Sequence, residues 1–294
     1  MMPQIFFDIT KRCNAQCIYC FTNSEITPVE NELSENEIED LFYKLIELRI
    51  ESVSIGGGEP LLKDVASFIN KFGDKIKISI TSNGMLIEEK FIQALKDSKS
   101  TKLTISLDSI NPETNEKVRV GINTSKVIEN IKWLSSIDEV RKRLSIRSTV
   151  SMCNIKELLD IINFCNKEKI PKLKVNSTNP FGRATLTKNI IPEFSDFMIK
   201  LQEIEKYCSE NKLYTDIELP IKKYLKEDNN CTLGNNSLYI DSFGNCYPCA
   251  FSNRKLCLGN IRLNNISEIL SSNKNFSHCN EICNKCEINR YKNY

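Results

Sequence analysis

The hydrophobic positions of the first 176 residues follow a strand–loop–helix rhythm that repeats six times. Amphipathic stretches predict helices that begin near Ser34, Asp64, Glu88, Ser125 and Ile155. The intervening apolar runs are nearly continuous, which is typical of parallel strands covered on both faces. These runs predict strands over residues 5–9, 52–55, 76–81, 103–107, 144–150 and 173–175.

This order of elements predicts an α/β fold in which a parallel sheet curls into a partial (β/α)6 TIM-like barrel. The loops at the carboxyl ends of the strands are then free to carry chemistry. We expect residues 1–185 to form this barrel and residues 186–230 to form a connecting helical segment. Residues 231–294 are expected to form a small C-terminal Cys-rich domain, with a hairpin over 238–247.

The charge balance excludes two classes of partner. The 294 residues include 40 Lys and Arg against 38 Asp and Glu, so the formal net charge is +2. Such a balance gives no basic field for nucleic acid or an anionic membrane. No apolar run is long enough to span a membrane, and the first residues do not resemble a signal peptide. We therefore expect a cytoplasmic protein.

Cysteine is unusually frequent, at 13 residues, and unevenly placed. Because cytosolic thiols stay reduced, metal or redox chemistry is a better interpretation than disulfides. His278 is the only histidine, so a His-rich zinc site is excluded. Three cysteines lie near the start, at 13, 17 and 20, and seven lie in the last 64 residues, at 231, 246, 249, 257, 279, 283 and 286.

The first cluster, Cys13-x3-Cys17-x2-Cys20, directly follows the first predicted strand. A closed structural zinc site needs four ligands, and no fourth Cys or His lies nearby. A [4Fe–4S] cluster held by three thiolates would leave one iron open for an exogenous ligand. A zinc knuckle completed by a distant ligand, or three unligated thiols, remain alternatives on the spacing alone.

These cysteines resemble the signature of the radical S-adenosylmethionine (SAM) superfamily. The resemblance covers roughly residues 4–185, and further motifs follow in the family's order after successive strands. They are Tyr19 before the last cysteine, Gly57-Gly58-Glu59-Pro60, Thr81-Ser82-Asn83-Gly84, Ser106-Leu107-Asp108-Ser109 and Asn179-Pro180-Phe181-Gly182-Arg183-Ala184. Five matches on a βα scaffold are far more specific than any one of them.

The resemblance implies a [4Fe–4S] cluster on Cys13, Cys17 and Cys20, with SAM chelating the open iron. Reductive cleavage of SAM would give a 5′-deoxyadenosyl radical that abstracts a substrate hydrogen. No amino-acid side chain supplies so strong an oxidant, which is why a cofactor is required. A flavodoxin-type or ferredoxin-type partner would supply the electron.

The resemblance also gives the motif residues roles at SAM. Gly57 and Gly58 would let the backbone approach the methionine moiety, and Glu59 would accept a hydrogen bond from its ammonium group. The other SAM-facing positions are Tyr19 near the adenine, and Asn83, Ser106 and Asp108 near the ribose. For Asp108, the alternative role is to cap the N-terminus of the helix that follows the strand.

The tail holds a second group of thiols, which on residue type alone could bind structural zinc. The segment 237–249 followed by Leu258-Gly259-Asn260-Ile261 resembles the SPASM domain or its shorter form, twitch. The resemblance implies one auxiliary [4Fe–4S] cluster on Cys231, Cys249, Cys283 and Cys286. Cys246, Cys257 and Cys279 could hold a second cluster, donate a hydrogen atom to a substrate radical, or be small buried residues.

The architecture resembles enzymes that mature ribosomally made peptides (RiPP maturation) by crosslinks, thioether bonds or epimerisation. Because the chain opens with the first barrel strand, a peptide substrate would need a separate recognition protein or capture by the barrel mouth. One alternative is an oxidoreductase that dehydrogenates a small-molecule alcohol. Another is a non-catalytic iron–sulfur electron carrier or zinc-binding protein. No residue is assigned as a general base.

Overall fold

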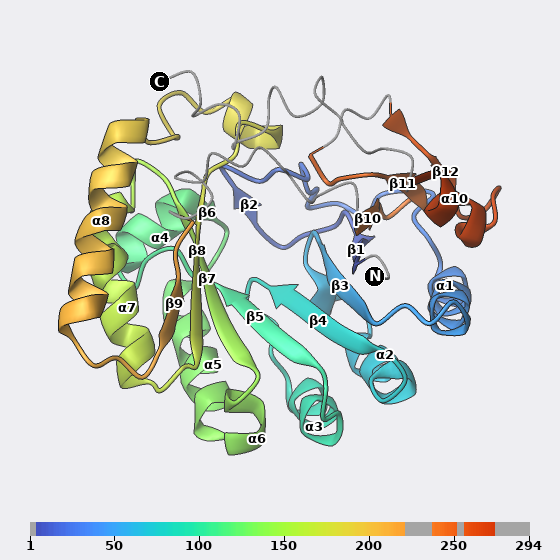
Figure 1. Cartoon of the computed structure of the whole chain (residues 1–294), viewed down its shortest axis with the longest axis horizontal. Coiled ribbons are helices and arrows are strands. Elements are labelled where there is room, and N and C mark those ends of the chain that lie inside the picture. The colour runs from blue at the N-terminus through green and yellow to red at the C-terminus, as the bar shows by residue number, and fades with distance from the viewer. Residues whose placement is uncertain (1–3, 221–236, 252–255, 274–294) are drawn as a thin grey trace.

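The computed structural model describes residues 4–220, 237–251 and 256–273 (Figure 1). All six predicted strands form, and adjacent strands in the order β1-β3-β4-β5-β7-β8 are parallel. Helices line the outer side of the curved sheet, so the predicted partial barrel is confirmed. The strands are β1 (Gln4–Thr10), β3 (Ser52–Gly57), β4 (Lys77–Ser82), β5 (Lys102–Ser106), β7 (Leu144–Val150) and β8 (Lys172–Ser177).

The helices begin close to their predicted starts. Ser34 and Glu37 form the predicted capping box of α1, and Asp64 caps α2. Among the described residues, no helix has the length and apolarity that crossing a membrane requires. The α-helices are α1 (Glu35–Glu47), α2 (Val65–Phe72), α3 (Glu89–Asp97), α4 (Pro112–Val118), α5 (Thr124–Ser136), α6 (Asp138–Arg141), α7 (Leu158–Lys167), α8 (Phe194–Glu210) and α10 (Ile266–Asn273).

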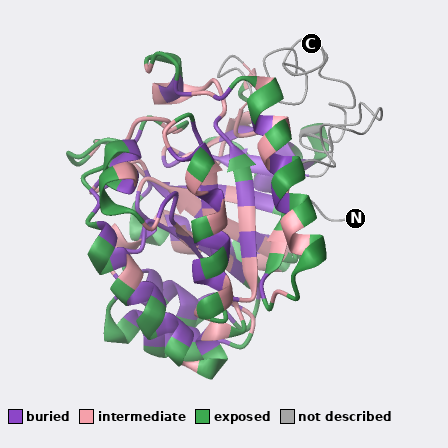
Figure 2. Ribbon diagram, turned by 90° about the vertical axis from the view of Figure 1, so that its left-hand side faces the viewer, coloured by how far each residue is buried: buried purple, intermediate pink, exposed green. Residues whose placement is uncertain are grey.

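Alternate residues of each barrel strand face the helices and form the core. Ile105, Ile146 and Leu173 are each at most 1% exposed. Each helix buries one side against these core residues and exposes its opposite side, as Figure 2 shows. The remaining strand positions therefore face the interior of the barrel.

The described part of the sheet has ten strands because both edges of the barrel are extended. β9 (Asp216–Glu218) pairs with β8, inside the segment predicted only as helical connection. The predicted hairpin forms as β10 (Ser237–Ile240) and β11 (Asn245–Tyr247), and β12 (Gly259–Asn260) pairs with β11. β10 pairs in parallel with β1, so the tail continues the barrel sheet. The boundaries at 185 and 230 stay predictions.

Arg262 fastens the tail to the start of α1. Its guanidinium donates to the carbonyl oxygens of Asn31 and Glu32, at 3.0 and 3.1 Å, and pairs with the Glu37 carboxylate. The hydrogen bond from Arg262 and those from Ser34 lower the pKa of Glu37 to about 2. The hairpin is thus held by both strand pairing and a side-chain clamp.

Candidate active site

The predicted motifs lie in loops at the carboxyl edge of the parallel strands. The loop that carries Cys13, Cys17 and Cys20, here called the cysteine loop, follows β1. It contains the short strand β2 (Gln16–Cys17). β2 pairs with β6 (Arg119–Val120), which places Cys17 opposite Arg119. The cysteine loop is therefore attached to an element more than 100 residues further along the chain.

The three thiols of the cysteine loop influence one another electrostatically. Burial raises the pKa of Cys13 to about 11, with smaller contributions from Cys17 and Cys20. Burial also tends to raise the pKa of Cys20, but hydrogen bonds from Ser24 and Thr22 outweigh it and lower that pKa. The two hydroxyls lie 3.5 and 3.2 Å from the Cys20 sulfur. They favour the thiolate, the form in which cysteine binds metal.

This donor set is compatible with a cluster held by three thiolates. In the described ranges, no three Cys, His, Asp or Glu side chains are placed to hold one metal ion, and all nine described cysteines are free thiols. A cubane cluster carries one thiolate per iron, so its thiolates need not meet at one atom. Cys13, Cys17 and Cys20 would hold three of the four irons.

The segment 179–184 braces the cysteine loop. The Arg183 Nε and Nη1 atoms each donate at 2.8 Å, to the carbonyl oxygens of Cys17 and Ser24. Its backbone N–H donates to the Cys20 carbonyl at 2.9 Å. Gly182 has φ +57°, and a Cβ there would lie 2.2 Å from the Cys20 carbonyl oxygen. This motif was identified by resemblance, and the structure supplies its physical role.

We expect Arg183→Lys to weaken the hold on the cysteine loop. A single ammonium cannot make the forked contact to two carbonyls, and losing one charged hydrogen bond costs about 1.5–3 kcal/mol. Iron should be extracted by a chelator about tenfold faster or more. The control is Arg49→Lys, at an exposed position. Equal extraction rates in both variants would contradict the bracing role.

The two glycines of Gly57-Gly58-Glu59 are required by close packing against β1. Gly57 has φ +108°, and a Cβ there would lie 2.4 Å from the Thr10 carbonyl oxygen. At Gly58 a Cβ would lie 2.0 Å from the Arg12 carbonyl oxygen. The structure thus gives a packing reason for both glycines, because the backbone of residues 10–12 occupies the space of a side chain. Their approach to the methionine moiety of SAM stays a prediction.

Glu59 is fully buried and joins the ends of β3 and β4. Its carboxylate accepts hydrogen bonds from the Ser82 hydroxyl at 2.8 Å and from the backbone of Asn83 and Leu61 at 2.7 and 3.0 Å. Burial raises its pKa, although these bonds oppose the shift. A carboxylate has roughly four acceptor positions, so one is left for an ammonium group. Its contact with SAM stays a prediction.

The two predicted ribose-facing residues Asn83 and Ser106 differ in their partners. The Asn83 amide donates to the Asn14 side chain at 2.7 Å, and its oxygen accepts from the backbone of Met85. Within the described residues, the Ser106 hydroxyl has no hydrogen-bond partner. Ser106 is therefore open to a ligand, whereas Asn83 connects β4 to the cysteine loop.

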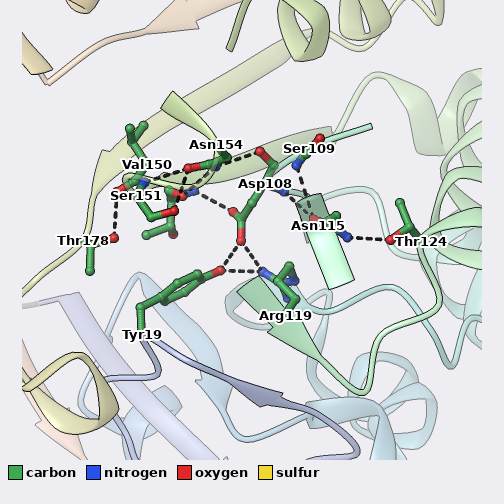
Figure 3. A network of polar contacts seen from close by, with 11 residues as sticks. Tyr19, Asp108, Ser109, Asn115, Arg119, Thr124, Val150, Ser151, Asn154 and Thr178 are labelled. Carbon is green, nitrogen blue, oxygen red and sulfur yellow. Dashed lines mark hydrogen bonds and ion pairs between the residues drawn. The ribbon is translucent and has the colours of Figure 1, made fainter. Parts of the chain in front are cut away.

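Asp108 is the centre of a buried polar network (Figure 3). Its carboxylate accepts hydrogen bonds from the Tyr19 hydroxyl and from the backbone of Thr149 at 2.7 Å. Arg119 lies 3.4 Å from the same carboxylate and donates to the Tyr19 oxygen at 2.9 Å. The N-cap alternative for Asp108 is wrong, because α4 is capped by Asn111.

This triad of Tyr19, Asp108 and Arg119 ties the cysteine loop to the barrel. Tyr19 lies within the loop and Arg119 pairs with Cys17. Arg119 was not predicted from the sequence, because neither the short strand β6 nor its pairing has a periodic signal. The role of Tyr19 near the adenine stays a prediction.

The described tail cysteines differ in environment. Cys249 is half-buried and its sulfur accepts a hydrogen bond from the Phe251 backbone at 3.4 Å. Cys246 is fully buried among core residues, which raises its pKa and favours the small buried residue interpretation. Cys257 is exposed. The other predicted tail ligands, Cys231, Cys279, Cys283 and Cys286, lie outside the described residues.

Aromatic rings connect the tail to the cysteine loop. Phe251 lies 5.3 Å from both Phe21 and Phe181, measured between ring centroids. Phe21 directly follows Cys20, and Phe251 lies two residues after Cys249. The predicted auxiliary ligand Cys249 is therefore next to the loop that would hold the SAM cluster.

Comparison with known proteins agrees with this geometry. Residues 7–182 match the Radical SAM superfamily, so the chain belongs to that superfamily. Residues 231–287 match the iron–sulfur cluster-binding domain SPASM. The protein is thus a radical SAM enzyme with a C-terminal auxiliary-cluster domain. Its cofactors are SAM, the [4Fe–4S] cluster that binds it, and an auxiliary iron–sulfur cluster. The non-catalytic and zinc alternatives are set aside.

Several relatives carry the name GTP 3′,8-cyclase or probable GTP 3′,8-cyclase. The protein of Limosilactobacillus fermentum is 30% identical over 251 residues, which are 82% of this chain and 70% of that protein. The "probable" cyclase of Methanocaldococcus jannaschii is 35% identical over 160 residues, which are 53% of each chain. The chain thus spans about half the length of the second relative.

Solved structures of two proteins share the fold. Streptococcus suis SuiB bound to S-adenosylmethionine has a TM-score of 0.77 and 17% identity, over 99% of this chain and 72% of SuiB. SuiB has also been solved with the precursor peptide SuiA, at a TM-score of 0.74 and 20% identity, over 99% and 71% of the two chains. Native anSMEcpe with bound AdoMet has a TM-score of 0.72 and 20% identity, over 92% and 82%.

Proposed function

We propose that this radical SAM enzyme modifies a ribosomally made peptide by oxidation, through a crosslink or thioether bond, or by epimerisation. When bound, the cluster and SAM supply the hydrogen-abstracting chemistry. The residues of the chain position that cofactor, admit the substrate and hold the auxiliary site near it. A flavodoxin-type or ferredoxin-type protein is the proposed electron donor, and a separate recognition protein is a proposed partner.

The observation that carries this proposal is a set of small polar side chains that face the interior of the barrel. Closed TIM barrels fill their interior with bulky apolar side chains. Here five of the inward positions carry small hydroxyl residues that remain half-buried. They are Ser54, Ser79, Thr81, Ser106 and Ser145. An interior of this kind suits a polar substrate that enters as an extended chain.

The position of Cys249 supports an oxidation. Through the contacts of Phe251 with Phe21 and Phe181, the tail site adjoins the cysteine loop. An auxiliary cluster there could take the electron that remains on the substrate after hydrogen abstraction. Loss of one hydrogen atom, one electron and one proton gives a net two-electron oxidation.

A second candidate is cyclisation of a purine nucleotide. It is favoured by the 30% identity to the cyclase of Limosilactobacillus fermentum over 82% of this chain.

The experiment is to co-express the protein with short peptides encoded beside its gene and to analyse them by mass spectrometry. We expect one peptide to lose the mass of two hydrogens, or to gain one deuterium in heavy water if it is epimerised. In parallel, the reconstituted protein is incubated with GTP, SAM and reductant. Conversion of GTP with every peptide unchanged would overturn the proposal in favour of the second candidate.

A further inference from the structure

Four inward-facing residues form one row across neighbouring strands of the barrel. Ser106 of β5 is aligned with Arg147 of β7, which is aligned with Lys174 of β8 and then with Glu218 of β9. The adjacent residues Ile146 and Ser148 are fully buried on the opposite face, so Arg147 faces the interior. The row begins at Ser106, the open hydroxyl expected to face the SAM ribose.

Two cations of this row, Arg147 and Lys174, form no close ion pair within the part of the chain that the structure describes. Neither the Arg147 nor the Lys174 side chain makes a hydrogen bond or a close ion pair with any described residue, and the Arg147 Nε atom is buried without a partner among them. The Glu218 charge acts on both side chains at longer range. The nearby carboxylates bind Lys172 instead, with Glu218 at 2.7 Å and Asp216 at 3.6 Å.

Arg147 and Lys174 repel each other, Glu218 offsets part of this repulsion, and a bound anion would reduce it further. Adjacent strands lie about 4.8 Å apart, and like charges directly opposite each other are destabilising. Burial lowers the pKa of Lys174, and the charges of Arg147, Lys172 and Lys102 lower it further, with Glu218 opposing them. The charges of three other cations thus act on Lys174, and among the described residues only Lys172 of these four is ion-paired with acidic side chains.

We propose that Arg147 and Lys174 form a binding subsite for a carboxylate of the peptide substrate. The inference rests on the proposed function and adds a substrate class to it: a peptide with an acidic side chain close to the modified residue. Arg147 can donate a planar fork of hydrogen bonds to a carboxylate, and Lys174 supplies a second positive charge.

The location of the subsite suits substrate positioning. Arg147 lies one strand, and Lys174 two strands, from Ser106, which corresponds to about 5 and 10 Å. A carboxylate held there would place the neighbouring carbon atoms of a peptide beside the expected position of the ribose. Fixing a reacting group in this way contributes through proximity and orientation.

The test uses the full-length protein reconstituted with iron, sulfide and SAM. The probes are the blocked peptide acetyl-Gly-Asp-Gly-amide, its Asn counterpart, inorganic phosphate and GTP, with binding followed by ligand-observed NMR. We expect the Asp peptide to bind at least about tenfold more tightly than the Asn peptide. Arg147→Gln and Lys174→Gln should each remove most of that difference.

Two controls separate binding from folding. Lys77→Gln changes an exposed lysine at the amino end of β4 and should leave the affinities unchanged. The thermal midpoints of Arg147→Gln and Lys174→Gln should equal or exceed that of the parent without anion, because each variant relieves repulsion. Added phosphate should raise the midpoint of the parent more than that of either variant.

The outcomes distinguish this inference from the proposed function. Equal affinities of all anions for the parent and both variants would overturn the subsite, whatever the mass-spectrometry experiment shows. Binding of GTP that depends on Arg147 and Lys174, without binding of the Asp peptide, would overturn its assignment to a peptide carboxylate. Failure of peptide modification with the expected anion binding would overturn the proposed function alone.

Discussion

Cys17→Ala is expected to abolish the release of 5′-deoxyadenosine from SAM. The structure places Cys17 in β2, paired with β6 and held by Arg183 through its carbonyl oxygen. Alanine keeps these backbone contacts and removes only the sulfur. The loss should therefore reflect cluster ligation and not collapse of the loop. The measurement is chromatography of 5′-deoxyadenosine after anaerobic reconstitution with dithionite.

The matched control is Cys208→Ala, which removes a half-buried thiol from α8, far from the cysteine loop in sequence. It should release 5′-deoxyadenosine at the rate of the parent. Iron analysis adds a second criterion, because Cys17→Ala should lose about four irons per chain and keep those of the tail. Release of 5′-deoxyadenosine at the parent rate by Cys17→Ala would show that the SAM cluster is assigned to the wrong cysteines.

Local patterns predicted most of the barrel. β7 has the predicted bounds 144–150, and the capping box at Ser34 and Glu37 is present as expected. Both signals depend on residues within one element, because alternation or capping is visible over a few positions. The position of the motif loops at one edge of the sheet followed from the parallel topology alone.

The contacts that assemble the site were not predictable in this way. Arg183 reaches Cys17 across 166 residues, and Arg119 reaches Tyr19 across 100. β10 pairs with β1 from the other end of the chain. Such pairings leave no periodic trace in the sequence, since each partner is an ordinary residue of its own segment. The motif around Arg183 was noticed only through resemblance, which carried no physical reason for it.

Asp108→Asn is expected to destabilise the protein and to impair the cysteine loop. The side chains of Asp108 and Arg119 are 0% and 6% exposed. Removing one partner of a buried ion pair costs about 3–5 kcal/mol, because the other charge is left uncompensated. The thermal midpoint should fall by roughly 5–10 °C, and the rate of 5′-deoxyadenosine release should fall with it. Asp160→Asn, at an exposed position of α7, is the control.

Adding Arg119→Met to Asp108→Asn separates stability from positioning. The double variant no longer buries an unpaired charge, and replacing both members of a buried pair by uncharged groups is often neutral. Its thermal midpoint should return close to that of the parent. Release of 5′-deoxyadenosine should stay slow, because Tyr19 and the strand that pairs with Cys17 have lost their shared anchor. Full recovery of that rate in the double variant would show that the triad only stabilises the fold and does not position the cysteine loop.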